Sequence, residues 1–136
     1  MKKTVLLLCS ILIIGISACT KTEYVPESNP NRTIYVTIPA ANWNPNANQT
    51  VWDVSADIPE IDNLIMDAGT VLADISFNDG VSFEPLSSTY NQQGYRFEYG
   101  LGYIVVDVQS TRGNVAIDPP ATAIVKLVLV DSQLVD

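Results

Sequence analysis

The sequence predicts an all-β fold, an antiparallel β-sandwich of about seven strands with one short helix. Three observations lead to this prediction. Apolar and polar residues alternate along seven short runs, turn-forming residues separate the runs, and one segment between them has helical spacing. A chain of 136 residues has room for one such domain rather than two.

The strand prediction rests on a period of two, which places one face of each strand on a core and the other in water. The last run is apolar on both faces except at Lys126, so it predicts a central strand or one covered on both sides. Asn78-Asp79-Gly80 predicts a hairpin turn, because Gly adopts positive φ freely and Asn and Asp tolerate it. Together these signals favour an immunoglobulin-like or similar sandwich. The seven runs are residues 33–38, 52–56, 71–77, 81–84, 95–101, 104–109 and 123–130.

Residues 59–69 (PEIDNLIMDAG) depart from the period of two and predict a helix of two to three turns. Their apolar residues are spaced by three, four and seven, which places them on one helical face. Pro59 suits the first turn, and Gly69 suits the position just beyond the last one. An irregular loop is the alternative.

Residues 1–18 have the pattern of a cleaved signal peptide. Lys2 and Lys3 precede an apolar stretch of twelve residues, Val5–Ile16. As a helix this stretch would rise about 18 Å, whereas a hydrocarbon core of about 30 Å needs roughly 20 residues. The stretch therefore predicts export rather than a membrane-spanning helix.

The motif Ile16-Ser17-Ala18-Cys19 at the end of this segment resembles the lipobox of bacterial lipoproteins. The resemblance implies cleavage before Cys19, diacylglycerol on its sulfur and an acyl chain on its new amino group. Two or three acyl chains give stable membrane anchoring. Cys9 would leave with the signal peptide, so the mature chain would have neither a free thiol nor a disulfide. An ordinary signal-peptidase site is the alternative.

Residues 19–32 are expected to be the lipidated cysteine and a flexible tether, followed by the sandwich domain over residues 33–136. The tether is polar, contains two prolines and could reach about 43 Å when extended. Lys21 and Glu23 partly match the lysine-plus-acid signal of surface-exported lipoproteins in the Bacteroidota. Thr20 stands where Asp would indicate inner-membrane retention. These features favour the outer membrane and its surface, with a periplasm-facing orientation as the alternative.

The domain itself is similar to a group of small Bacteroidota lipoproteins with a single β-domain. The similarity covers roughly residues 33–130 and is carried by Trp43, residues 57–61 (DIPEI), residues 69–72 (GTVL) and the Asn-Asp-Gly turn. It implies a β-domain on a lipid anchor. It brings no catalytic motif with it.

Composition excludes several kinds of chemistry. The chain contains no His, which excludes Ser-His-Asp and Cys-His catalysis and imidazole metal sites. It has 15 acidic and 7 basic residues, for a net charge of −8, and the mature chain after residue 18 would have a charge near −10. That balance disfavours nucleic acid as a partner. No cofactor-binding fingerprint is present.

Four carboxylates lie within ten residues of one another, at Asp53, Asp57, Glu60 and Asp62. A solvated strand face and helix start is the simplest interpretation. Calcium binding and a pair of catalytic carboxylates are the alternatives, since calcium takes six to eight oxygens and glycosidases use paired acids.

Aromatic residues in polar segments are candidates for ligand binding, because flat amphipathic rings suit the faces of sugars. Trp43 and Tyr90 are the stronger candidates and Tyr103 a weaker third, whereas Trp52, Tyr95 and Tyr99 are expected in the core. We therefore expect a non-enzymatic, lipid-anchored envelope protein of interaction or structural role, with a glycan or another envelope protein as partner. A carbohydrate-binding module is the alternative.

Overall fold

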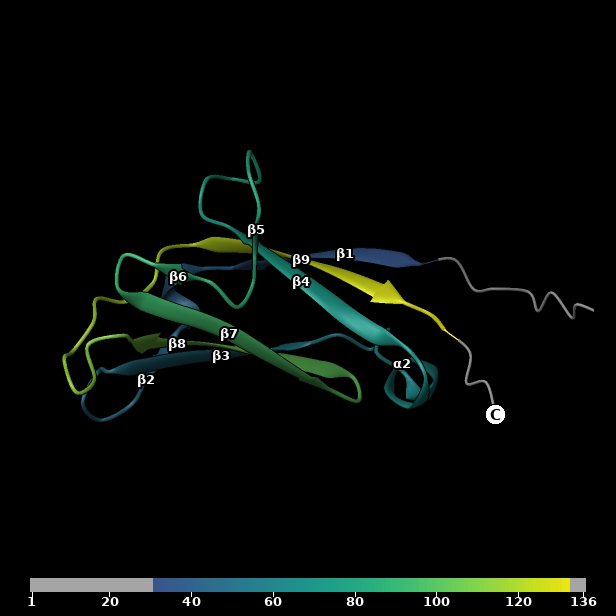
Figure 1. The fold of residues 1–136 in the computed structure, drawn as a ribbon, viewed down its shortest axis with the longest axis horizontal. Helices are drawn as coiled ribbons and strands as arrows, with labels where there is room; N and C mark the ends of the chain where they lie inside the picture. Colours follow the sequence, from purple (N-terminus) through teal and green to yellow (C-terminus); the bar gives the residue numbers. More distant parts are fainter. Residues whose placement is uncertain (1–30, 133–136) are drawn as a thin grey trace, which may run out of the picture.

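The computed structural model describes residues 31–132 as two antiparallel sheets packed face to face, with one short helix at one end (Figure 1). The all-β sandwich is thus confirmed. The first sheet has the strand order β1-β9-β4-β5 and the second the order β2-β3-β8-β7-β6. The strands are β1 (Arg32–Ile38), β2 (Asn44–Pro45), β3 (Val51–Asp57), β4 (Thr70–Ser76), β5 (Glu84–Pro85), β6 (Thr89–Tyr90), β7 (Gln93–Gly100), β8 (Tyr103–Ser110) and β9 (Ala123–Val130).

Six of the seven predicted strands are present as β1, β3, β4, β7, β8 and β9. The burial of these strands alternates along the chain, as the period of two requires. β9 is central in its sheet, between β1 and β4, which confirms the first of the two expectations for its apolar sequence. Its inward side chains Val125, Leu127 and Leu129 have no exposed surface.

The seventh predicted strand, residues 81–84, is present only at its last residue, because β5 begins at Glu84 and residues 81–83 lie in a loop. β4 does pair with β5 in an antiparallel hairpin, but a loop joins them and Val81 is 84% exposed. The loop is stabilised by local bonds that compete with strand pairing. Asn78 Oδ1 accepts from the Ser82 amide at 3.0 Å, and the buried Ser76 Oγ accepts from the Gly80 amide at 2.9 Å. Asp79 and Gly80 adopt the expected positive φ.

The helix α2 (Asn63–Asp67) is shorter than predicted, with five residues instead of two to three turns. It begins late because Asp62 is extended and caps it, accepting from the amides of Leu64 and Ile65 at 3.0 and 3.1 Å. A 3₁₀ turn, η1 (Ala40–Asn42), precedes β2. α2 packs Ile65 into the core.

The two ends of the sandwich differ. β1 begins and β9 ends beside α2 (Figure 1), since Arg32 pairs with Leu129. The β7–β8 turn lies at this same end, because the Gly102 amide donates to Ile61 O at 2.8 Å. The opposite end, where β7 and β9 begin and β8 finishes, carries the β6–β7 turn and the loop from Thr111 to Thr122. We call it the loop end.

Candidate functional site

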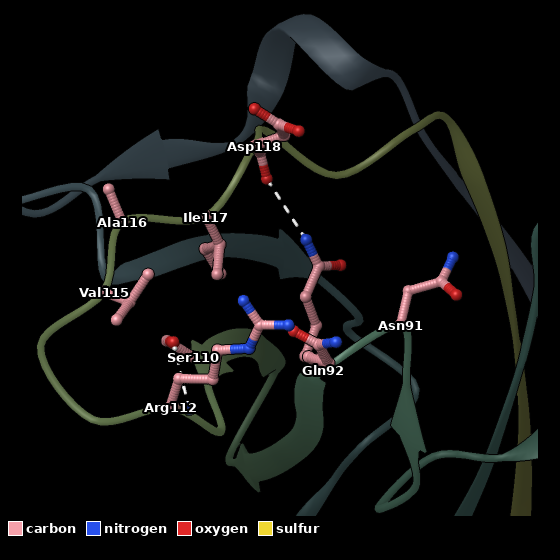
Figure 2. A pocket seen from close by; sticks show the side chains of 9 residues that line it. Asn91, Gln92, Ser110, Arg112, Val115, Ala116, Ile117 and Asp118 are labelled. Carbon is pink, nitrogen blue, oxygen red and sulfur yellow. Dashed lines mark hydrogen bonds between the residues drawn. The ribbon is translucent and has the colours of Figure 1, made fainter.

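The loop end carries a shallow depression of about 180 Å³ (Figure 2). Two segments of the chain form it, namely residues 91–93 at the β6–β7 turn and residues 110–118, which run from the end of β8 into the loop before β9. Its lining residues are Asn91, Gln92, Gln93, Ser110, Arg112, Val115, Ala116, Ile117 and Asp118. Pockets for drug-sized ligands are typically about 300–1,000 Å³ and largely apolar. This depression therefore suits one small polar group rather than an enclosed ligand.

The backbone conformation of the β6–β7 turn places the amide side chains of Asn91 and Gln92 at the depression. Tyr90 pairs with Gln93, and the two residues between them, Asn91 and Gln92, have φ values of +46° and +64°. Two consecutive residues at positive φ are typical of a type I′ hairpin, which usually contains Gly. The side chains of both residues lie on one margin of the depression (Figure 2). A search of the sequence for Asn-Gly turns misses this hairpin, since Gln occupies position 92 and Gly94 follows two positions too late.

Hydrogen bonds join the two segments. The amide and the hydroxyl of Thr111 both donate to Gln92 O at 2.9 Å. Gln93 Nε2 donates to Asp118 O at 3.3 Å, the bond that ends on Asp118 in Figure 2. Gln93 Oε1 in turn accepts from the Tyr95 hydroxyl at 2.7 Å. The margin of the depression is thereby linked to a core tyrosine.

Burial raises the pKa of the Tyr95 hydroxyl to about 12, and the neighbouring Tyr90 adds a smaller effect in the same direction. Desolvation disfavours the tyrosinate form, so this hydroxyl remains a hydrogen-bond donor to Gln93 at physiological pH. It acts as a structural support for the turn.

Tyr90, one of the predicted ligand-binding residues, lies next to the depression and is 46% exposed. Its ring stacks on Phe77, with centroids 5.8 Å apart and planes at 14°. It also lines a second hollow of about 160 Å³, together with Phe77, Asn78 and Glu84 among others. Tyr90 thus lines the second hollow, precedes Asn91 of the first in sequence, and keeps about half of its surface exposed.

Trp43, the other strong candidate, is in the core. The expectation that it is exposed is wrong, because only 4% of its surface is accessible. It follows η1 at the crossover from one sheet to the other, so its polar neighbours face solvent while its ring turns inward. Its indole N–H has no hydrogen-bond partner among residues 31–132.

Tyr103 is 43% exposed but lies at the other end of β8, in register with Asp57 and Gly100 near α2. The eight residues of β8 extend about 25 Å, so Tyr103 and Tyr90 cannot contact one ligand of small size. The three predicted aromatics therefore do not form one site. Trp52 and Tyr95 are buried as expected, and Tyr99 is half-buried.

The four carboxylates do not converge either. Asp53 and Asp57 point outward from β3 four residues apart, a separation of about 13 Å along the strand. Glu60 lies in the turn before α2, and the Asp62 side chain caps the helix and lies 3.7 Å from the Arg32 guanidinium. Within residues 31–132 no group of three or more Asp, Glu, Cys or His side chains is placed to hold a metal ion. The calcium and paired-acid alternatives have no geometric support there.

A different acidic pair lies on the outer face of the second sheet. Asp53 of β3 stands directly opposite Asp107 of β8, and like charges in register oppose pairing. Arg96 on β7 compensates, with its Nε 2.6 and 2.7 Å from the two Asp107 carboxylate oxygens. The hydrogen bond with Asp107 raises the pKa of Arg96. The Arg96–Asp107 pair thus offsets the repulsion between the two carboxylates on this face of the sheet.

Comparison of the chain with models of protein families, with curated proteins and with solved structures finds no match. No helix among the described residues is long and apolar enough to cross a bilayer. Cys19, the predicted signal peptide and the predicted tether up to residue 30 lie outside the described residues. Arg32, predicted as the last residue of the tether, is the first residue of β1.

Proposed function

We propose that this protein is a lipid-anchored component of the bacterial cell envelope, whose sandwich has an interaction or structural role rather than a catalytic one. The observation that carries the proposal is the lipobox-like Ile16-Ser17-Ala18-Cys19 after a short, positively headed apolar segment. The location favoured by Thr20, Lys21 and Glu23 is the outer membrane, with the domain at the cell surface.

The arrangement of the domain agrees with attachment on its N-terminal side. β1 begins at Arg32 beside α2, whereas the polar depression lies at the loop end. A tether ahead of Arg32 thus joins the sandwich at the end remote from the depression, which stays accessible to a partner.

Replacement of Cys19 by Ala tests the anchor. The parent chain is expected in the detergent phase of a phase partition and to incorporate labelled palmitate. Cys19→Ala is expected in the aqueous phase or as unprocessed precursor, without label. Cys9→Ala is the matched control, because Cys9 lies in the apolar segment and should leave both readouts unchanged. Normal processing and detergent partitioning of Cys19→Ala would contradict lipidation.

Carbohydrate binding at the cell surface is the second candidate, favoured by the composition of the depression. Amide, guanidinium and carboxylate groups are suited to sugar hydroxyls, and the exposed ring of Tyr90 adjoins Asn91. A glycan array probed with the parent chain, Tyr90→Ala and Arg112→Ala tests it. Tyr103→Ala, at the opposite end, serves as the control. Absence of binding, or binding that is equal in all four proteins, would eliminate this candidate.

A further inference from the structure

The four edges of the two sheets are not equivalent. Edge strands carry unpaired backbone groups, and natural proteins restrict them by shortness, proline or charge. β2, β5 and β6 have two residues each, and β2 and β5 contain Pro45 and Pro85. β1 has seven residues, and none of Thr33–Ile38 is charged or proline.

The free side of β1 is open within the described part of the chain. β1 pairs with β9 over all seven residues, and no other strand or helix among residues 31–132 packs closely along it. Alternate residues of an antiparallel strand direct their N–H and C=O groups away from the existing partner. β1 therefore offers a regular row of donors and acceptors to one more strand.

The core side of this edge is also incompletely covered. Ile34 and Val36 point toward the core but are half-buried, whereas Ile38 at the end of the strand is 2% exposed. A strand added beside β1 would cover these two aliphatic side chains with its own. The apolar gain would add to the backbone hydrogen bonds.

The sequence of β1 is complementary to itself. Thr33-Ile34-Tyr35-Val36-Thr37 reads as hydroxyl, aliphatic, aromatic, aliphatic, hydroxyl in both directions. In an antiparallel pair centred on Tyr35, Thr33 would face Thr37, Ile34 would face Val36, and the two Tyr35 rings would meet. Thr–Thr, β-branched and aromatic pairs are the favourable cross-strand combinations. A two-fold interface requires this self-matching, since each copy contributes the same residues.

We propose that β1 is a homodimerisation edge, at which two copies pair their β1 strands antiparallel about Tyr35 and join their four-stranded sheets into one. The proposal goes beyond the lipid anchor and does not depend on it. Residues 20–31 could reach about 40 Å when extended, more than the length of β1, about 24 Å. Two anchored copies could therefore pair on one membrane.

Tyr35 provides a charge-swap test that separates pairing from folding. It is 61% exposed, lies beside Lys126 of β9, and its ring centroid is 6.1 Å from that of Phe83 in the β4–β5 loop. Glu or Lys at this position removes this surface contact but no core contact, so both variants should fold. Full-length copies with two different C-terminal tags are co-expressed, extracted in detergent and purified through one tag. Wild-type copies are expected to co-purify. Tyr35→Glu with itself, and Tyr35→Lys with itself, should reduce the recovered second copy about fivefold, because like charges then face each other.

Co-expression of Tyr35→Glu with Tyr35→Lys should restore recovery, a result that a folding defect cannot produce. Recovery of the tagged wild-type copies at background level would overturn the proposal, as would equal recovery in all four combinations. Tyr35→Cys gives an independent readout, because Cα atoms opposite each other in a strand pair lie within disulfide range. Oxidation should cross-link this variant between copies well above the parent chain, which contains Cys9 and Cys19. Leu72→Cys, exposed on β4 two strands away, should stay at the parent level; equal cross-linking at both positions would also overturn the proposal.

Discussion

Gly69 lies where α2, the start of β4 and the end of β9 meet, and its replacement by Ala should destabilise the domain. A Cβ at this position would stand 2.7 Å from Val130 O and 2.9 Å from Ile65 Cα. Both are backbone atoms, so relief requires α2 and β9 to separate. Gly69 is not among the glycines at positive φ, so the need for Gly arises from close approach rather than from a left-handed cap.

The magnitude follows from two opposing effects. Inserting a methyl group into a packed site costs about 1–3 kcal/mol. The smaller conformational freedom of Ala in the unfolded chain returns about 0.4–1 kcal/mol. We expect the free energy of unfolding to fall by about 1–2 kcal/mol, which for a domain of this size lowers Tm by roughly 5–15 °C.

Urea unfolding followed by tryptophan fluorescence measures this change, because Trp43 and Trp52 are both buried and should report loss of the core. Gly100→Ala is the matched control. Its Cβ would come equally close, 2.6 Å, but to ring atoms of Tyr103, a side chain that is exposed and can rotate away. We expect less than about 1 kcal/mol there. A Gly69→Ala midpoint equal to wild type, or an equal loss in Gly100→Ala, would refute the argument.

Two further predictions concern the loop end. Gln92→Gly should raise the free energy of unfolding by up to about 1 kcal/mol in urea titrations, because Gly adopts the positive φ of a type I′ turn without strain. Gln109→Gly, within β8, is the control and should lower the free energy of unfolding. A lower free energy of unfolding in Gln92→Gly would contradict the turn assignment. The raised pKa of Tyr95 predicts a stabilisation that is complete below about pH 10 and is lost as pH rises through about 12. Two pKa units correspond to at most about 2.7 kcal/mol of unfolding free energy. Titration followed by tyrosinate absorbance should show a late step near pH 12 that disappears in Tyr95→Phe and persists in the control Tyr103→Phe. If the late step persisted in Tyr95→Phe, it would not arise from Tyr95.

The strands could be predicted from the sequence because alternation is local and each of the six long strands keeps one face on the core. The failure at residues 81–83 has a local cause too. Ser76, Asn78 and Ser82 hydrogen-bond one another and the loop backbone, and this network replaces the strand that Val81 and Phe83 suggest. Side-chain competition of this kind does not alter the apolar period, so the period cannot reveal it.

The helix illustrates a different limit. Apolar spacing correctly located α2, but residues 59–62 share the helical spacing without the helical backbone. Asp62 is extended because its carboxylate caps the amides of Leu64 and Ile65. An acid early in a helix and an acid that caps it look alike in sequence, and they differ by the placement of the first turn.

None of the residues that line the depression is among the aromatic candidates that the sequence predicts. Tyr90, which lies next to it, is predicted because it is aromatic in a polar segment, a local property, and its role in ligand binding stays a prediction. Trp43 shares that property, yet the crossover between the sheets turns its ring into the core. The depression depends on Asn91, Arg112 and Asp118, which approach one another only after β6–β7, β8 and β9 have paired. Neither composition nor spacing encodes that juxtaposition.

The two ends of the sandwich differ in how their backbone is held. At the α2 end, Ile61 and Ile65 have no exposed surface, and Gly102 exchanges backbone hydrogen bonds with the segment before the helix. At the loop end, Asn91 and Gln92 hold an unfavourable backbone conformation that tertiary hydrogen bonds maintain. This strain lies in a solvent-exposed polar loop and adds nothing to the packing of the core. We therefore expect a ligand, if the domain binds one, to contact the loop end.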